Sequence, residues 1–241
     1  MSVVDLEIAK TEGSRRTTPS RERFERLYRT LRDRICLLEY PPGTRISEGE
    51  LADEFAISRT PVRRVLTRLE SEGLIEAHHG VGTIVTDVKL EELTQVYHLR
   101  MELAVLIGRL SPIVRSRGDL DRIRVLIERC DALPRDSDHK AFARLNMDFF
   151  SEITAMTGNL PLRDISERLY FQTSRIILKL MPRLNLAEEF AAFHREMTDV
   201  LAALEIGDIE AVGHIRRAHI SMSFARMMRY ALEPAVEIRS A

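Results

Sequence analysis

The sequence predicts a mainly α protein with two domains. The first is an N-terminal winged helix-turn-helix with a small β-hairpin wing, and the second is a C-terminal all-α antiparallel helical bundle. Hydrophobic residues recur at helical spacing along most of the 241 residues, and a strand pattern occurs only between residues 74 and 86. Eleven glycines and nine prolines are too few for a loop-rich β protein, and a hydrophobic content of 44% excludes global disorder.

Residues 1–20 are expected to form a flexible arm, because glycine, serine, threonine and proline break every periodic pattern there. The first helix is expected over residues 21–38. It is amphipathic, with arginines on the faces that its hydrophobic residues leave free. Those hydrophobic residues are Leu27, Leu31, Ile35 and Leu38. Two prolines and a glycine at 41–43 end this helix.

Two short helices with a tight turn between them follow. Ser47 and Glu50 have the spacing of a capping box, which predicts a helix from Glu48 to Phe55. After a turn at residues 56–58, a second helix begins with a proline in its first turn and ends near Gly73. This pair is typical of a helix-turn-helix.

A β-hairpin is expected after Gly73, where the hydrophobic pattern changes to strands on both sides of residues 78–82. It completes a winged helix over residues 21–88. Residues 89–235 show helical patterns only and are expected to form about six helices, antiparallel because their connections are short. The expected breaks are Pro112, Arg117-Gly118, Leu133-Pro134, Gly158-Asn159, Met181-Pro182 and Gly207-Asp208.

Net charge alone does not identify a partner, because 36 Lys and Arg nearly balance 37 Asp and Glu. The distribution is more informative. The second helix of the helix-turn-helix has four arginines and no acidic residue between Glu54 and Glu70; the arginines are Arg59, Arg63, Arg64 and Arg68. An arginine near the start of such a helix can pair with guanine in the major groove. Ser58 and Thr60 can donate to phosphates. The alternative is a solvated helix face.

These motifs resemble the N-terminal domain of GntR-family bacterial transcription regulators. The resemblance rests on five ordered segments between Leu38 and Val85: Pro-Pro-Gly-Thr-Arg-Ile-Ser-Glu, Glu-Leu-Ala, Ile-Ser-Arg-Thr-Pro-Val-Arg-Arg-Val-Leu, Leu-Glu-Ser-Glu-Gly-Leu-Ile and Gly-Val-Gly-Thr-Ile-Val. It implies that the helix contacts DNA bases, that the wing tip reaches the minor groove and that Arg45 contacts phosphate. The expected DNA-binding residues are Arg45, Ser58, Arg59, Thr60, Arg63, Arg64, His79 and Gly80.

The helical domain is similar to the FCD domain of the FadR subfamily of these regulators. The resemblance implies a dimeric bundle whose pocket binds a small carboxylate or acyl ligand, in most members beside a divalent metal held by one Asp and three His. Here Asn146, Phe150 and Met197 stand where the Asp and two of the His are expected, and only His219 is in register. His194 lies one turn before Met197.

The ligand set for Zn, Ni or Mn is therefore incomplete, and a metal-free, more apolar pocket is the expected alternative. Arg100 matches a family arginine that points into the pocket and can clamp a carboxylate with two hydrogen bonds. Its alternative is a surface arginine. The expected effector-binding residues are Arg100, Asn146, Phe150, Arg175, His194, Met197 and His219, with Tyr97 and Ser174 as weaker candidates.

The predicted function is a homodimeric regulator, with repression favoured by the resemblance, that binds a palindromic operator and responds to a small organic acid. A metal-responsive regulator is the alternative, with His194, His219 and a carboxylate such as Asp148 as ligands. A helical metal-dependent enzyme is disfavoured, because the sequence has no Gly-rich phosphate loop, His-Glu-x-x-His or nucleophile motif.

No membrane partner is expected, because the longest apolar stretches, such as Leu103 to Ile107, are far too short to cross a bilayer. Residues 1–20 lack the apolar region of a secretory signal, so the protein is expected in the cytoplasm. Cys36 and Cys130 are far apart in helical patterns, which predicts buried thiols rather than a disulfide or zinc finger.

Overall fold

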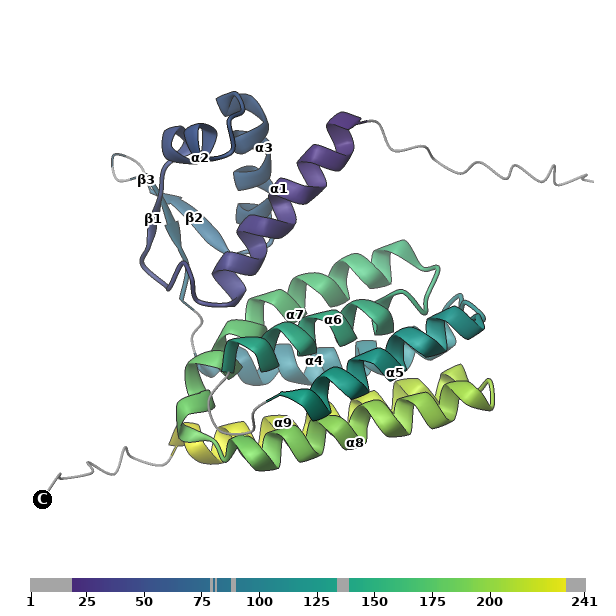
Figure 1. Cartoon of the computed structure of the whole chain (residues 1–241). Coiled ribbons are helices and arrows are strands. Elements are labelled where there is room, and N and C mark those ends of the chain that lie inside the picture. The colour runs from purple at the N-terminus through teal and green to yellow at the C-terminus, as the bar shows by residue number, and fades with distance from the viewer. Residues whose placement is uncertain (1–18, 79, 81, 88–89, 134–138, 233–241) are drawn as a thin grey trace, which may run out of the picture.

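A winged-helix domain stands on one side of a six-helix bundle in the computed structural model (Figure 1). The structure describes residues 19–78, 80, 82–87, 90–133 and 139–232. The first domain contains α1 (Pro19–Cys36), β1 (Arg45–Ile46), α2 (Glu48–Glu54), α3 (Arg59–Ser71), β2 (Ile75–His78) and β3 (Gly82–Val85). The expected fold class is confirmed, and the expected arm at 1–20 lies almost entirely outside the described residues.

The helix-turn-helix begins as its sequence predicts. The Ser47 hydroxyl accepts a hydrogen bond from the backbone N–H of Glu50 at 3.3 Å and caps α2. One face of α3 is buried against α1 and α2, and its residues are Val62, Val65, Leu66 and Leu69. The wing has a third strand that the sequence pattern did not reveal: β1 pairs antiparallel with β3, giving the sheet order β1-β3-β2. Two residues are too few to show an alternating pattern.

The second domain consists of α-helices and one 3-10 turn in the part of the chain that the structure describes. They are α4 (Leu90–Arg109), α5 (Arg117–Ala132), α6 (His139–Thr154), α7 (Leu160–Leu180), η1 (Met181–Arg183), α8 (Leu186–Glu205) and α9 (Ile209–Leu232). The expected break at Arg117-Gly118 is wrong. Ser116 is the N-cap of α5, so these two residues are its first two helical positions.

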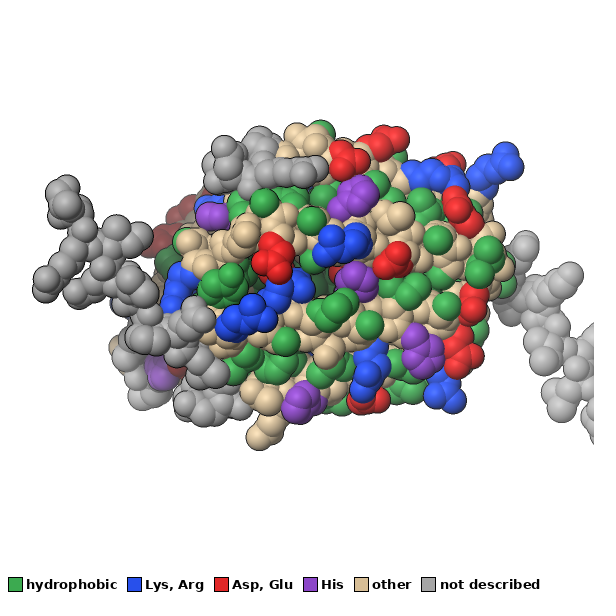
Figure 2. Space-filling model, turned by 90° about the horizontal axis from the view of Figure 1, so that it is seen from below, with side chains coloured by type: hydrophobic (Ala, Val, Ile, Leu, Met, Phe, Trp, Pro, Cys, Tyr) green, Lys and Arg blue, Asp and Glu red, His purple; other side chains and the backbone are tan. Residues whose placement is uncertain are grey.

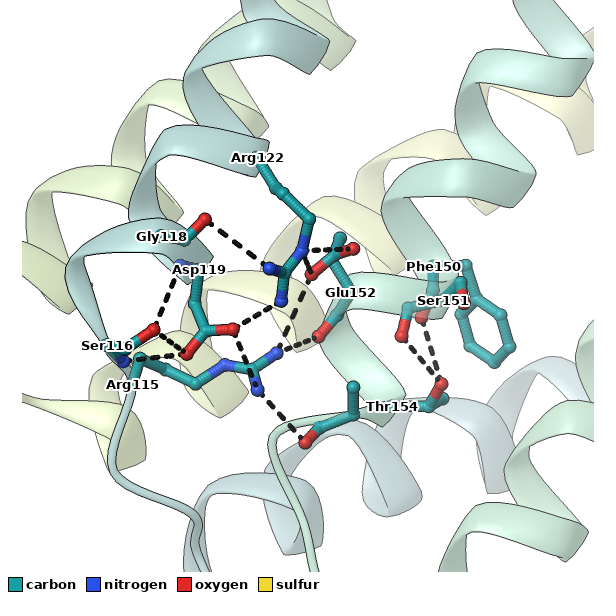
Figure 3. Close-up of polar contacts among 10 residues, drawn as sticks. Arg115, Ser116, Gly118, Asp119, Arg122, Phe150, Ser151, Glu152 and Thr154 are labelled. Atoms are coloured by element: carbon teal, nitrogen blue, oxygen red, sulfur yellow. Dashed lines mark hydrogen bonds and ion pairs between the residues drawn. The ribbon is translucent and has the colours of Figure 1, made fainter. Parts of the chain in front are cut away.

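A polar cluster holds the beginning of α5 against the end of α6 (Figure 3). Ser116 and Asp119 form a reciprocal capping box, in which each side chain bonds the other residue's backbone N–H. Arg122 bridges Asp119 on its own helix and Glu152 on α6. Arg115 donates to the carbonyls of Glu152 and Ala155 at 2.9 and 3.3 Å. The cluster therefore connects two helices through side-chain and backbone groups at once.

α4 and α9 pack closely, because each presents a glycine to the other. A Cβ on Gly108 would lie 2.4 Å from the carbonyl oxygen of Ile209, and one on Gly213 would lie 2.9 Å from that of Ala104. The backbones of α4 and α9 are therefore closer together than any residue larger than glycine would allow at these two positions. α4 is thus held close against α9.

The winged helix rests on α7, the helix of the bundle that faces it in Figure 1. The Arg32 guanidinium lies 3.8 Å from the ring centroid of Phe171. Gln172 donates to the carbonyl of Glu72 at 2.6 Å. Arg175 donates to the carbonyl and hydroxyl of Thr86 at 2.6 and 2.7 Å.

The opposite face of the bundle is chemically mixed. Seen from below, hydrophobic side chains alternate with acidic, basic and histidine side chains (Figure 2). Of the described helices, none is long and apolar enough to cross a membrane.

Candidate functional site

The beginning of α3 presents an exposed polar surface. Ser58 is the N-cap and makes no side-chain capping bond, so its hydroxyl is free to meet another group. Arg59, Thr60 and Arg63 are all exposed in the first two turns. These positions follow from the burial of Val62, which turns its neighbours outward. The expected base-reading residues are therefore brought together on one helix end.

The four arginines of α3 have different environments. Arg63 forms an ion pair with Glu48 of α2, Nη2 to Oε2 2.8 Å, and its side chain stays 68% exposed. Hydrogen bonding to Arg63 lowers the pKa of the Glu48 carboxyl. Arg64 lies over the Phe24 ring at 5.2 Å. Arg68 instead bonds Glu25 and Glu72 and contributes to packing within the domain.

Arg45 and Gly80 belong to the wing. The Arg45 side chain is exposed and lies along the backbone of Gly82, where a Cβ would sit 3.1 Å from its Nε. Gly80 is exposed with φ +76°, a conformation that favours glycine, and a Cβ added there would meet no atom beyond its chain neighbours within 4 Å. His79 lies outside the described residues.

A cavity of about 70 Å³ lies inside the bundle beside α7. Side chains from α1, α4, α6, α7, α8 and α9 line it. They include Cys36, Tyr97, Arg100, Phe142, Asn146, Tyr170, Ser174, Ile177, Glu196, Arg216, His219 and Ile220. Since Cys36 belongs to α1, this cavity extends to the winged-helix domain. Two larger hollows are open grooves along α1.

Arg100 lies in the cavity wall and is 8% exposed. Its Nη1 donates to the Thr173 hydroxyl at 2.7 Å, and its guanidinium lies 4.8 and 5.2 Å from the ring centroids of Tyr97 and Tyr170. No carboxylate among the described residues forms an ion pair with it. The expectation of an inward-facing arginine agrees with this geometry, and the surface alternative does not.

A second recess of about 20 Å³ adjoins the first, since Arg100 and Arg216 line both. The Ser166 hydroxyl lines this recess and has no hydrogen-bond partner within the described chain. The Tyr97 hydroxyl, in the larger cavity, also has none there. Buried polar atoms normally find a partner, so these hydroxyls are suited to a ligand or water.

Glu196 and Arg216 form a buried ion pair in the same wall. Sequence analysis missed both residues. The signal was available, because Glu196 lies four residues from Ala192 and Val200, and Arg216 four from Val212 and Ile220, all on buried faces. A charged residue at a core position of a helix indicates a buried pair or a site.

The remaining expected pocket residues lie in several places. Asn146 and His219 line the cavity, with His219 Nε2 3.4 Å from Asp199 Oδ2. Phe150 stacks on Tyr170, with 3.8 Å between centroids, and borders the smaller recess. Met197 is fully buried in the hydrophobic core.

Two expected residues face elsewhere. His194 pairs with Asp131 of α5 at 3.4 Å and borders a different hollow. Arg175 bonds Thr86 and does not line the cavity. Its long side chain reaches the neighbouring domain, which spacing along one helix cannot show.

The residues do not fit a divalent metal. Phe150 has no donor atom, Met197 is enclosed in the core, and His194 and His219 face different hollows. Asp148 pairs with Arg129 at 2.8 Å. Among the described residues, no three His, Cys, Asp or Glu side chains lie together.

The cavity's neutral groups stay un-ionised at physiological pH. Burial raises the pKa of the Cys36 thiol to about 11 and raises the pKa values of the Tyr97 and Tyr170 hydroxyls. Tyr97 can therefore donate a hydrogen bond, and Cys36 contributes a small apolar surface.

Two family models match the chain: "Bacterial regulatory proteins, gntR family" over residues 23–85 and "FCD domain" over residues 95–222. The chain belongs to the GntR family and carries an FCD domain. Like its relatives in this family, it is a transcriptional regulator and not an enzyme.

Similar proteins support this assignment. An HTH-type transcriptional regulator in an unstable DNA locus of Streptomyces ambofaciens is 30% identical over 209 residues, 82% of each chain. The HTH-type transcriptional repressor RspR of Escherichia coli K12 is 25% identical, covering 84% of this chain and 87% of RspR. The solved structure of E. coli McbR/YncC shares the fold, with a TM-score of 0.74 at 22% identity, covering 86% and 98% of the two chains.

Proposed function

We propose that this GntR-family regulator is a repressor whose operator affinity changes when a small organic acid binds beside Arg100. The observation that carries the proposal is a buried guanidinium that borders a cavity and has no carboxylate partner among the described residues. A buried charge is costly unless it is paired, so an anionic ligand would stabilise this site.

The proposed DNA interface is the beginning of α3 together with the wing. Arg59, Thr60 and Arg63 would meet base edges in the major groove, because the first turns of a recognition helix enter it. Ser58, Arg64 and Arg45 would hold phosphates and set the register. Gly80, with His79 beside it in the sequence, would approach the minor groove. A protein with such contacts would act at the chromosome, in the cytoplasm.

A homodimer is proposed, since a two-fold protein reads a two-fold operator. Each copy would then place its α3 in one of the two half-sites. Regulation requires that the acid bind the DNA-competent and incompetent arrangements with different affinities, because equal affinity shifts nothing. The cavity is suited to this, since Cys36 of α1 forms part of its wall.

The Arg59→Ala/Arg63→Ala double variant tests the DNA interface. Operator affinity is expected to fall roughly 30-fold or more, since each guanine-reading arginine contributes about 1 to 3 kcal/mol. The slope of log affinity against log salt should also become shallower. Fluorescence anisotropy with labelled operator at several salt concentrations measures both quantities.

Arg117→Ala, an exposed arginine of the bundle, is the matched control and should bind DNA normally. Glu48→Gln should tighten binding, because Glu48 competes with DNA for Arg63. Unchanged affinity and slope in the double variant would place the DNA interface elsewhere.

Arg100→Met tests the effector site. A carboxylate at about 100 times its dissociation constant should add roughly 2.7 kcal/mol to the free energy of unfolding of the wild-type protein. The variant should show no such gain, since methionine fills the space without the charge. Thermal unfolding with a carboxylate panel measures the effect, and Arg117→Met is the control. Equal stabilisation of Arg100→Met and wild type would sink the assignment.

A further inference from the structure

The ion pair of Arg216 and Glu196 lies in the wall of the proposed effector cavity. Nη1 of Arg216 donates to Oε1 of Glu196, both residues are less than a tenth exposed, and the Arg216 guanidinium also lies 5.1 Å from the Phe149 ring centroid. Both residues line the larger recess, and Arg216 lines the smaller one as well. The pair is thus available to a bound molecule.

The buried charges of the cavity do not cancel. Arg100 and Arg216 contribute two positive charges, and Glu196 contributes one negative charge. Cys36 and the two tyrosines are un-ionised. His219 Nε2 lies 3.4 Å from Oδ2 of the exposed Asp199. Of the arginines that line the cavity, Arg100 is the one that has no carboxylate partner among the described residues.

That balance matches one anionic group. A single carboxylate bound in the cavity would neutralise the net charge of these three side chains, whereas a second carboxylate would be buried without a cation in a cavity that already holds Glu196. Without Glu196 the same cavity would hold two free guanidiniums and would accept two negative charges.

The other residues that line the cavity indicate the chemistry of the uncharged part of the ligand. Tyr97, Tyr170, Phe142, Ile177 and Ile220 form a mainly apolar surface around about 70 Å³, which is small for a ligand pocket. The Ser166 hydroxyl in the smaller recess lacks a partner and can bond a carboxylate or hydroxyl oxygen near the two arginines.

We propose that the Glu196–Arg216 pair makes the effector site selective for a small monocarboxylate over the dicarboxylate of the same chain length. The inference rests on the proposed function and deepens it, because it assigns the charge of the effector at the same site.

The test compares butanoate with succinate and hexanoate with adipate by isothermal titration calorimetry on the full chain. Wild type should bind each monocarboxylate roughly tenfold or more tightly than its dicarboxylate partner. Glu196→Gln should shift that ratio about tenfold or more toward the dicarboxylate, because the cavity gains one net positive charge. Arg216→Met should lose affinity for both, because it leaves Glu196 unpaired.

The double variant Glu196→Gln/Arg216→Met restores one net positive charge and should regain the wild-type preference. If Glu196→Gln does not fold, the other two variants still test the charge selectivity. Arg216→Met should lose binding, and the double variant should recover it. Circular dichroism confirms folding of each variant.

Two different failures are distinguishable. If wild type binds none of the four acids while its operator binding is intact, the proposed effector site is wrong, and the selectivity is wrong with it. If wild type binds dicarboxylates as tightly as monocarboxylates, or the ratio is the same in Glu196→Gln and wild type, the charge selectivity is overturned and the effector site stands.

Discussion

Asp119 shows how a single residue carries two functions in this fold. Hydrogen bonds from the backbone and hydroxyl of Ser116 lower the pKa of its carboxyl to about 2, and Arg122 contributes further. The carboxylate caps α5 and also contacts an arginine that reaches α6 (Figure 3). Its ionised form therefore stabilises both the helix start and the contact between two helices.

Asp119→Asn should lower the free energy of unfolding at pH 7 by about 1 kcal/mol, the usual contribution of a capping side chain. The pKa of Asp119 is lower in the folded state than its ordinary value of 3.8. Its contribution is therefore complete above about pH 4 and is lost as pH falls toward 2. Urea unfolding at several pH values measures this: the difference in free energy of unfolding between wild type and Asp119→Asn should become smaller as the pH falls from about 4 to about 2.

Asp121→Asn is the control for this prediction. Asp121 lies on the same helix and pairs with Arg124, but its side chain is 59% exposed and it caps nothing. It should change stability little at any pH. If the difference in free energy of unfolding between wild type and Asp119→Asn did not change with pH, the charge of Asp119 would not explain its stabilising contacts with Ser116 and Arg122.

Arg100 and Arg175 differ in how much of their environment the sequence could predict. Both were expected in the pocket, and both are buried. Arg100 lies among hydrophobic residues on a face that helical periodicity identifies, so its inward direction could be predicted. The partner of Arg175, Thr86, lies 89 positions away in another domain, and no local pattern carries that information.

Helix pairs are the next scale, and the crossing of α4 and α9 depends on glycine. Gly108→Ala would place a Cβ 2.4 Å from the Ile209 carbonyl oxygen, which is backbone and cannot rotate away. The helices would have to separate, so we expect a loss of about 1 to 3 kcal/mol in the free energy of unfolding. Chemical denaturation measures it.

Gly118→Ala is the matched control within α5. A Cβ there meets only the Ser116 hydroxyl at 3.8 Å, so this variant should be neutral or gain up to about 1 kcal/mol through lower unfolded-state entropy. If Gly108→Ala were as stable as Gly118→Ala, the close crossing would have no energetic role.

At the scale of the whole molecule, α7 connects the cavity to the winged helix. Tyr170, Thr173 and Ser174 face Arg100 or line the cavity, while Gln172 and Arg175 bond the other domain. A ligand that moves α7 would therefore move the contacts that hold the DNA-binding domain.

Arg175→Met should reduce the ligand-induced change in operator affinity by roughly fivefold or more. A factor of this size is at the low end of the coupling usually found between two linked binding sites. The variant removes two hydrogen bonds to Thr86 and keeps the volume of the side chain. Operator titrations with and without the effector measure the coupling.

Lys179→Met is the control, because Lys179 meets only the exposed Asp87 across the same boundary at 3.3 Å. An exposed ion pair contributes little, so coupling should stay intact. Full coupling in Arg175→Met would show that the signal takes another route.

The sequence by itself determined the order of elements, the winged helix followed by a helical bundle, and the exposed arginines at the start of α3. These features follow from local spacing: hydrophobic periodicity, a capping pair and a proline in the first turn act within a few residues. Arg100 was expected in the pocket because it matches a family arginine, and the pattern of its helix left a surface position as the alternative.

Only the tertiary structure decided which charges share a cavity. Glu196 and Arg216 are 20 positions apart on two helices, and their pairing depends on how α8 and α9 face each other. The strand β1 and the contact of Arg175 with Thr86 likewise depend on distant partners. Long-range pairing is a property of packing, and a single sequence shows each helix face but not the face opposite it.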